Sequence, residues 1–77
     1  MKKSLSSATL RRMTTYLAYL RSISERLPQY VSATMIASAL HLGDVQVRKD
    51  LAKAAGPGHT KIGRDKAELI RGIEQSI

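Results

Sequence analysis

The segment 31-VSATMIASALHLGDVQVRKDL-51 carries the clearest indication of the fold. Ser32 is a good N-cap, and the apolar residues that follow it recur at helical spacing. We therefore expect a helix over 33–42. Its apolar face would consist of Met35, Ile36, Ala39 and Leu40.

A second helix follows after a very short turn. Gly43 is placed to end the first helix, and Asp44 is a good N-cap for a helix over 45–55. The core side of this second helix would carry Val47, Leu51 and Ala54 or Ala55. Two short helices that meet at 41-HLGD-44 are typical of a helix-turn-helix pair.

A longer helix is expected before this pair, over 7-SATLRRMTTYLAYLRSISERL-27. Ser6 or Ser7 can cap its start, and Pro28 should end it, because the residue before a proline is biased out of the helical region. The apolar positions recur at spacings of three and four, and Tyr16 widens the stripe. They are Leu10, Met13, Leu17, Leu20, Ile23 and Leu27.

The remaining segments predict a small β element and a last helix. Tyr30 and Val31 favour a brief strand within 29–33, and 59-HTKIG-63 favours a short extended run after 56-GPG-58. Asp65 and Glu68 resemble a capping box that opens a helix over 66–77. The apolar positions of that helix are Leu69, Ile70, Ile73 and Ile77.

These elements predict a fold that is mainly α with a small β element, a winged helix-turn-helix. Residues 1–6 would be a basic flexible tail and 7–77 the domain. The recognition helix would occupy about 44–55 and the wing about 56–64.

Size and composition exclude several classes of protein. The chain has 77 residues, which is one small domain without room for a large substrate cleft, so we do not expect an enzyme. It has no cysteine, and two isolated histidines, His41 and His59, do not make a metal site. We expect a cytoplasmic protein, because no apolar stretch is long enough for a signal peptide or a membrane span.

The charge pattern favours double-stranded DNA as the partner. The net charge is +7, and six basic residues lie within 44–66. In the third helix, Gln46, Arg48 and Lys49 are candidates for base contacts and Lys53 for a phosphate contact. The other candidates are His59 and Lys61 in the wing, and Arg11 and Arg12 near the start of the first helix. A glycine-rich phosphate loop is not indicated, because G-x-x-x-x-G-K-[ST] is absent.

Three segments resemble one family in unbroken order. They are 8-ATLRRMTTYLAYL-20, 31-VSATMIASALHLGDVQVRKDL-51 and 62-IGRDKAELIRGI-73, and they resemble the N-terminal domain of Rex, a bacterial redox-sensing transcriptional repressor. The most specific piece is 46-QVRKDL-51. The resemblance implies a winged helix that binds an AT-rich inverted repeat. It also implies that Arg48 and Lys49 enter the major groove and that Arg12 lies near the DNA backbone.

The resemblance also has departures. The aromatic positions that follow the family's recognition helix are occupied by Lys53, Ala54, Pro57 and Arg64, and the wing arginine position is Thr60. No G-x-G-x-x-G is present, so no cofactor is expected in this chain. The resemblance implies that NADH or NAD binds a separate Rossmann domain, which also forms a homodimer. This domain alone is expected to be monomeric.

Two other functions compete with DNA binding. Winged helices also serve as protein-protein interaction modules, with the third helix packed against a partner, and this alternative stays open. A basic membrane-surface peptide is disfavoured, because the charges do not lie opposite one continuous apolar helix face.

Overall fold

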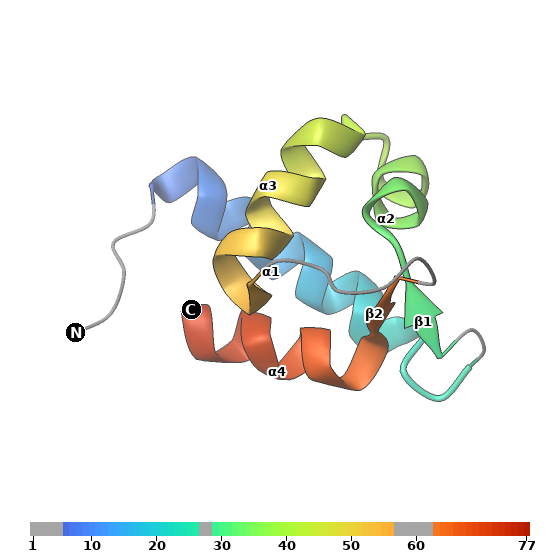
Figure 1. Ribbon diagram of the computed structural model, residues 1–77. Helices are drawn as coiled ribbons and strands as arrows, with labels where there is room; N and C mark the ends of the chain where they lie inside the picture. The colour runs from blue at the N-terminus through green and yellow to red at the C-terminus, as the bar shows by residue number, and fades with distance from the viewer. Residues whose placement is uncertain (1–5, 27–28, 57–62) are drawn as a thin grey trace.

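The computed structural model describes residues 6–26, 29–56 and 63–77, and its element order is that of a winged helix-turn-helix. Four helices enclose the core, and two short strands pair at one end of it (Figure 1). The elements are α1 (Ser7–Ser22), β1 (Tyr30–Val31), α2 (Ala33–Leu40), α3 (Asp44–Ala55), β2 (Arg64–Asp65) and α4 (Lys66–Ser76). No helix within the described ranges is long and apolar enough to cross a membrane.

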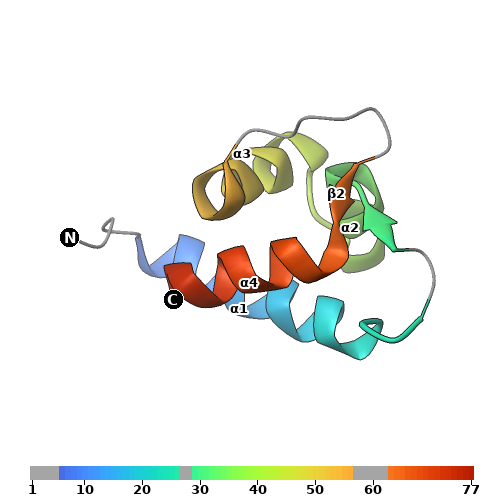
Figure 2. The same ribbon diagram turned by 60° about the horizontal axis from the view of Figure 1, so that its bottom comes forward.

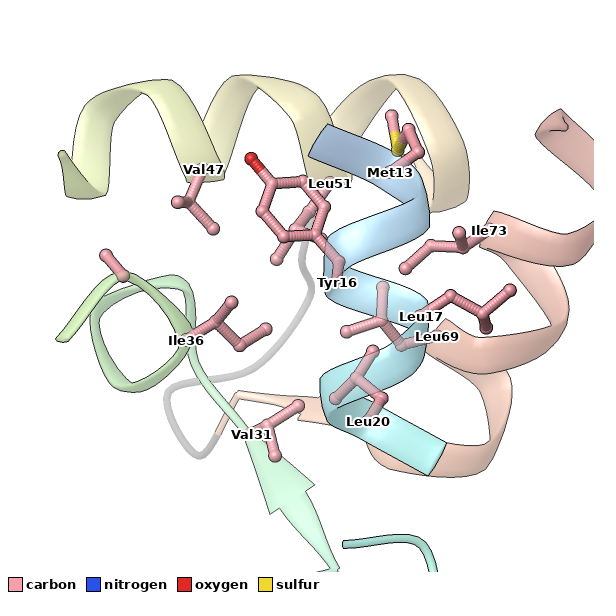
Figure 3. Packing of buried hydrophobic residues seen from close by; sticks show 11 residues of the cluster. Met13, Tyr16, Leu17, Leu20, Val31, Ile36, Val47, Leu51, Leu69 and Ile73 are labelled. Carbon is pink, nitrogen blue, oxygen red and sulfur yellow. The ribbon is translucent and has the colours of Figure 1, made fainter. Parts of the chain in front are cut away.

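The helices pack around a single apolar core. Helix α2 packs against α3, and α4 packs against both α3 and α1. Figure 2 shows α1 and α4 side by side, with α3 on the other side of α4 and α2 behind the two strands. Side chains from all four helices and from β1 meet in the centre (Figure 3). The buried cluster is Met13, Tyr16, Leu17, Leu20, Val31, Ile36, Ala37, Val47, Leu51, Leu69 and Ile73.

Most predicted core positions are buried or partly buried, and Leu10, Ala39 and Ile77 are exposed. Leu27 lies outside the described ranges. Leu10 and Ile77 are exposed because each lies near an outer end of its helix. Ala39 is also exposed, and Ala37 takes its place in the core. The prediction for α2 therefore had the correct helix with one core position misassigned.

Helix α1 ends earlier than its apolar pattern predicted. It stops at Ser22, after which the N–H groups of Ser24 and Arg26 donate to carbonyls three residues back, at 3.3 and 3.0 Å. The ammonium group of the buried Lys66 donates to the carbonyl oxygens of Ile23 and Arg26. The prediction of a helix up to residue 27 was therefore wrong. The chain can leave the helix here because Lys66 hydrogen-bonds to carbonyls that the helix no longer satisfies.

The turn between α2 and α3 also differs from the prediction in how it is capped. His41, not Gly43, adopts the left-handed conformation that ends α2, with φ of 58°. Gly43 is the N-cap of α3, and Asp44 lies inside the first turn without a capping hydrogen bond. There its carboxylate faces the positive end of the helix, where a negative charge is stabilising.

The small sheet closes the base of the predicted wing. β1 and β2 are antiparallel, with Tyr30 opposite Asp65 and Val31 opposite Arg64. The second strand lies at 64–65. Most of the extended run expected over 59–63 falls within 57–62, which lies outside the described ranges, so that expectation stays a prediction. Arg64 donates to the carbonyl oxygen of Gly56 at 2.5 Å, which ties the end of α3 to the start of β2.

Gly63 allows the chain to enter β2, and replacing it should destabilise the fold. Its φ is +102°, and a Cβ there would lie 2.6 Å from the carbonyl oxygen of Val31. We expect Gly63→Ala to lower the free energy of unfolding by about 1–3 kcal/mol in a urea titration. The control is Gly43→Ser, because Gly43 has open space around it and serine is a good N-cap. Equal stability of the two variants would contradict this account of Gly63.

Candidate nucleic-acid interface

The candidate interface is the outer face of α3. At roughly 3.6 residues per turn, Val47, Asp50 and Leu51 share one side of the helix, and all three are buried. The opposite side carries Val45 and Lys49, both exposed. The flanks of this outer face carry Gln46, Arg48 and Lys53, which are exposed as well.

The four polar residues predicted in α3 are thus brought onto one surface. Arg48 lies 3.6 Å from the carboxylate of Asp44 one turn earlier, and its side chain is 62% exposed. Such an exposed pair contributes little to stability, so the guanidinium can exchange this partner for another anion at small cost. The side chains of Lys49 and Lys53 make no hydrogen bond or ion pair within the described part of the chain.

A buried carboxylate behind this surface joins α3 to α1. Asp50 is fully buried and accepts four hydrogen bonds. Oδ2 accepts from Arg12 Nε at 2.6 Å and from the Tyr16 hydroxyl at 2.5 Å. Oδ1 accepts from Arg12 Nη2 at 3.2 Å and from Gln46 Nε2 at 3.0 Å. The two oxygens thereby use their full hydrogen-bonding capacity.

This network keeps Asp50 ionised. Burial alone would raise the pKa of Asp50, but the hydrogen bonds from Arg12 and Tyr16 outweigh burial and hold it below its ordinary value of 3.8. Burial and the bond to Asp50 raise the pKa of Tyr16 far above its usual value, so its hydroxyl remains a donor. Figure 3 shows that the ring of Tyr16 fills the core between α1, α2 and α3.

Asp50 also orients the side chain of Gln46. An ionised carboxylate only accepts hydrogen bonds, so the amide nitrogen of Gln46, not its oxygen, must face Asp50. The amide oxygen and the second N–H are then available to another partner. A neighbouring acceptor and donor of this kind match the N6 and N7 groups of adenine in the major groove.

The two arginines of α1 have different surroundings. Arg12 donates to Asp50 and also, from Nη2, to the Thr9 hydroxyl at 3.2 Å, so its guanidinium is engaged inside the domain. Its contact with the DNA backbone stays a prediction. Arg11 is exposed and, with Leu40 and Leu42, lines a hollow between α1 and the turn before α3.

Sequence reasoning missed the hydrogen bonds that Asp50 accepts from Arg12 and Tyr16 behind the interface. The signal was present, because Asp50 lies three residues after Val47 and so falls on the core side of α3. An acidic residue at a core position requires buried donors. Arg12 and Tyr16, one turn apart on α1, were the residues that could supply them.

The sequence model of the family described as "Putative DNA-binding protein N-terminus" matches residues 4–52. The match begins just before α1 and includes α1, α2 and most of α3. The chain belongs to this family.

Two Rex repressors are similar to nearly the whole of this chain, which confirms the resemblance to Rex. The chain is 32% identical over 69 residues to the redox-sensing transcriptional repressor Rex of Bacteroides fragilis, which covers 90% of this chain and 31% of that protein. It is 34% identical over 72 residues to the Rex repressor of Treponema denticola, covering 94% of this chain and 34% of that protein. The chain thus spans about a third of the length of these curated relatives.

Two residues that the sequence predicts to contact DNA lie outside the described ranges. His59 and Lys61 fall within 57–62, so their predicted role in the wing stays a prediction. The family match ends at residue 52, before the wing begins. Within the described ranges, no three His, Asp or Glu side chains are grouped as they would be to hold a metal ion.

Proposed function

We propose that this chain is the sequence-specific DNA-binding domain of a Rex-like redox-sensing transcriptional repressor. The observation that carries the proposal is the two-sided character of α3. Its inner side is held by the core and by Asp50, whereas its outer side exposes Gln46, Arg48, Lys49 and Lys53. A helix held this way can enter the major groove with its first turns toward the bases.

The proposal assigns a role to each cation and polar group. Gln46 contacts an adenine, and Arg48 and Lys49 contact guanine acceptors or nearby phosphates. Lys53, two turns into the helix, binds a phosphate. Arg11 and Arg12 lie toward the DNA backbone at the start of α1. His59 and Lys61 complete the interface from the wing.

The finer parts of the proposal rest on the likeness to Rex. We propose an AT-rich inverted repeat as the site, bound by two copies of the domain held in a homodimer, while the isolated domain is monomeric and binds more weakly. The redox response would come from NADH or NAD bound to a separate Rossmann domain. Repression would follow from occlusion of promoter DNA in the cytoplasm.

Removing the two central cations of α3 tests the proposal. We expect Arg48→Ala/Lys49→Ala to weaken binding to a selected duplex roughly 30-fold or more, because each base contact contributes about 1–3 kcal/mol. The duplex would be selected from a randomised library by the wild-type domain, and binding would be measured by fluorescence anisotropy. The double variant should also lose preference at the base pairs that these two side chains contact.

The matched control removes the same charge elsewhere. Arg26→Ala/Arg71→Ala also deletes two exposed arginines, one after α1 and one on α4. It should weaken binding only slightly and leave the base preference unchanged. Equal losses in the two double variants would mean that net charge alone causes binding. A wild-type domain without any sequence preference would favour a protein-interaction module instead.

A further inference from the structure

The outer face of α3 carries one large apolar side chain that the polar contacts proposed above leave without a partner. Val45 is 56% exposed, more than any other large hydrophobic residue in the described part of the chain. A single exposed valine is not unusual by itself. Its position is informative, because Val45 lies in the first turn of α3 and faces the same way as Lys49, one turn later.

The surroundings of Val45 favour a nucleic acid over a protein as the partner of this side chain. Arg48 and Lys49 flank it, and both are exposed. The buried centre of a protein interface is depleted of charged residues, whereas a DNA interface is rich in cations. A valine among cations therefore fits a polyanion that presents a small apolar group at the same depth.

The major groove of DNA presents one such group. Among the four bases, only thymine carries a methyl group on its major-groove edge. Valine suits it, because a β-branched side chain in a helix is confined to one preferred rotamer and loses little freedom on contact. Burying one methyl group away from water should strengthen binding about fourfold.

We propose that Val45 is a specificity-determining residue that contacts the 5-methyl group of a thymine in the major groove. This inference rests on the proposed function and adds a base contact that no charged or polar side chain of α3 can make. Gln46 follows Val45 directly, and its amide is oriented by Asp50. The first turn of α3 thus presents an apolar contact next to a hydrogen-bonding edge suited to adenine.

Replacing thymine with uracil tests the contact, because it removes only the methyl group. The probe is the duplex selected from a randomised library by the wild-type domain, prepared with each thymine in turn replaced by deoxyuridine. For the wild-type chain, one replacement should weaken binding about fourfold. Val45→Ala should bind the unmodified duplex about fourfold more weakly and lose nothing further at that thymine. Lys53→Ala removes a phosphate contact, so it should lose affinity at the same thymine, and by the same factor, as the wild type.

Two results would overturn the inference and are distinguishable from failure of the proposed function. A sequence preference with no thymine sensitive to loss of its methyl group would leave DNA binding intact and refute the role of Val45. The same conclusion follows if wild type and Val45→Ala lose affinity equally at every thymine that is replaced by deoxyuridine. Loss of all sequence preference in the wild-type chain would refute both proposals together. Val45 is exposed, and alanine is the better helix former, so Val45→Ala should fold normally.

Discussion

Asp50→Asn should lower the free energy of unfolding by about 3–5 kcal/mol, because it leaves Arg12 without its anionic partner next to a fully buried site. The amide would also turn a donor toward the Tyr16 hydroxyl or Gln46, each of which now donates to the carboxylate. For a domain of this size, the loss corresponds to a fall in Tm of roughly 12 °C or more. Urea titration and thermal denaturation followed by circular dichroism measure it.

The chain contains a well-matched control for this prediction. Glu74 pairs with Arg21 at 2.6 Å, the same distance as the shortest contact between Arg12 and Asp50. Both partners of the Arg21–Glu74 pair are largely exposed, so Glu74→Gln should cost less than about 1 kcal/mol. Similar losses of unfolding free energy in the two variants would show that burial of Asp50 does not increase the contribution of its contacts to stability.

The pH dependence of stability provides an independent check of the same contacts. The pKa of Asp50 is held below 3.8 in the folded state, so the full contribution of Asp50 to stability is present above pH 3.8. It is lost as the pH falls through the lower, folded-state pKa. The stability difference between wild type and Asp50→Asn should therefore be constant near neutral pH and narrow in acid. A difference that grew below pH 3.8 would contradict the direction of the shift.

DNA affinity should fall by a factor on the order of 100 when the salt concentration rises from about 50 to about 200 mM. Four exposed cations lie on or beside the proposed interface, namely Arg11, Arg48, Lys49 and Lys53. If about four phosphates are neutralised, the slope of log K against log salt is about −3.6. Anisotropy titrations of the selected duplex at several salt concentrations measure this slope.

Single variants separate the phosphate contacts from the base contacts. Lys53→Ala should make the slope shallower by about one unit and weaken all sequences equally. Val45→Ala removes no charge, so its slope should equal that of the wild type. A Lys53→Ala variant with the wild-type slope would remove Lys53 from the phosphate contacts, and a flat wild-type slope would be incompatible with the proposed function.

The helices could be predicted from the sequence because their signals are local. The spacing of Met13, Leu17 and Leu20 places α1. Asp65 caps α4 by accepting from the N–H groups of Ala67 and Glu68, which is the N-cap half of the predicted capping box. The exposure of Arg48 and Lys49 follows from the burial of Val47 and Leu51 on the opposite side of the same helix.

The ends of the helices were less predictable because tertiary contacts set them. α1 ends where Lys66, 43 residues away from Ile23, binds the last carbonyls. α2 ends at His41 although a glycine stands two residues later, because the N–H groups of His41 and Leu42 both bond to the carbonyl of Ala37. Neither contact has a signature in the local pattern.

The helix-turn-helix order and the cationic outer face of α3 follow from the sequence, because both depend on helical periodicity and on residues close together in the chain. How that face is held depends on tertiary contacts. Arg12 and Tyr16 lie 38 and 34 residues before Asp50, and the shared core of α1 and α3 brings them to its carboxylate. Since Asp50 in turn orients Gln46, the chemistry that α3 presents depends on contacts that no local pattern specifies.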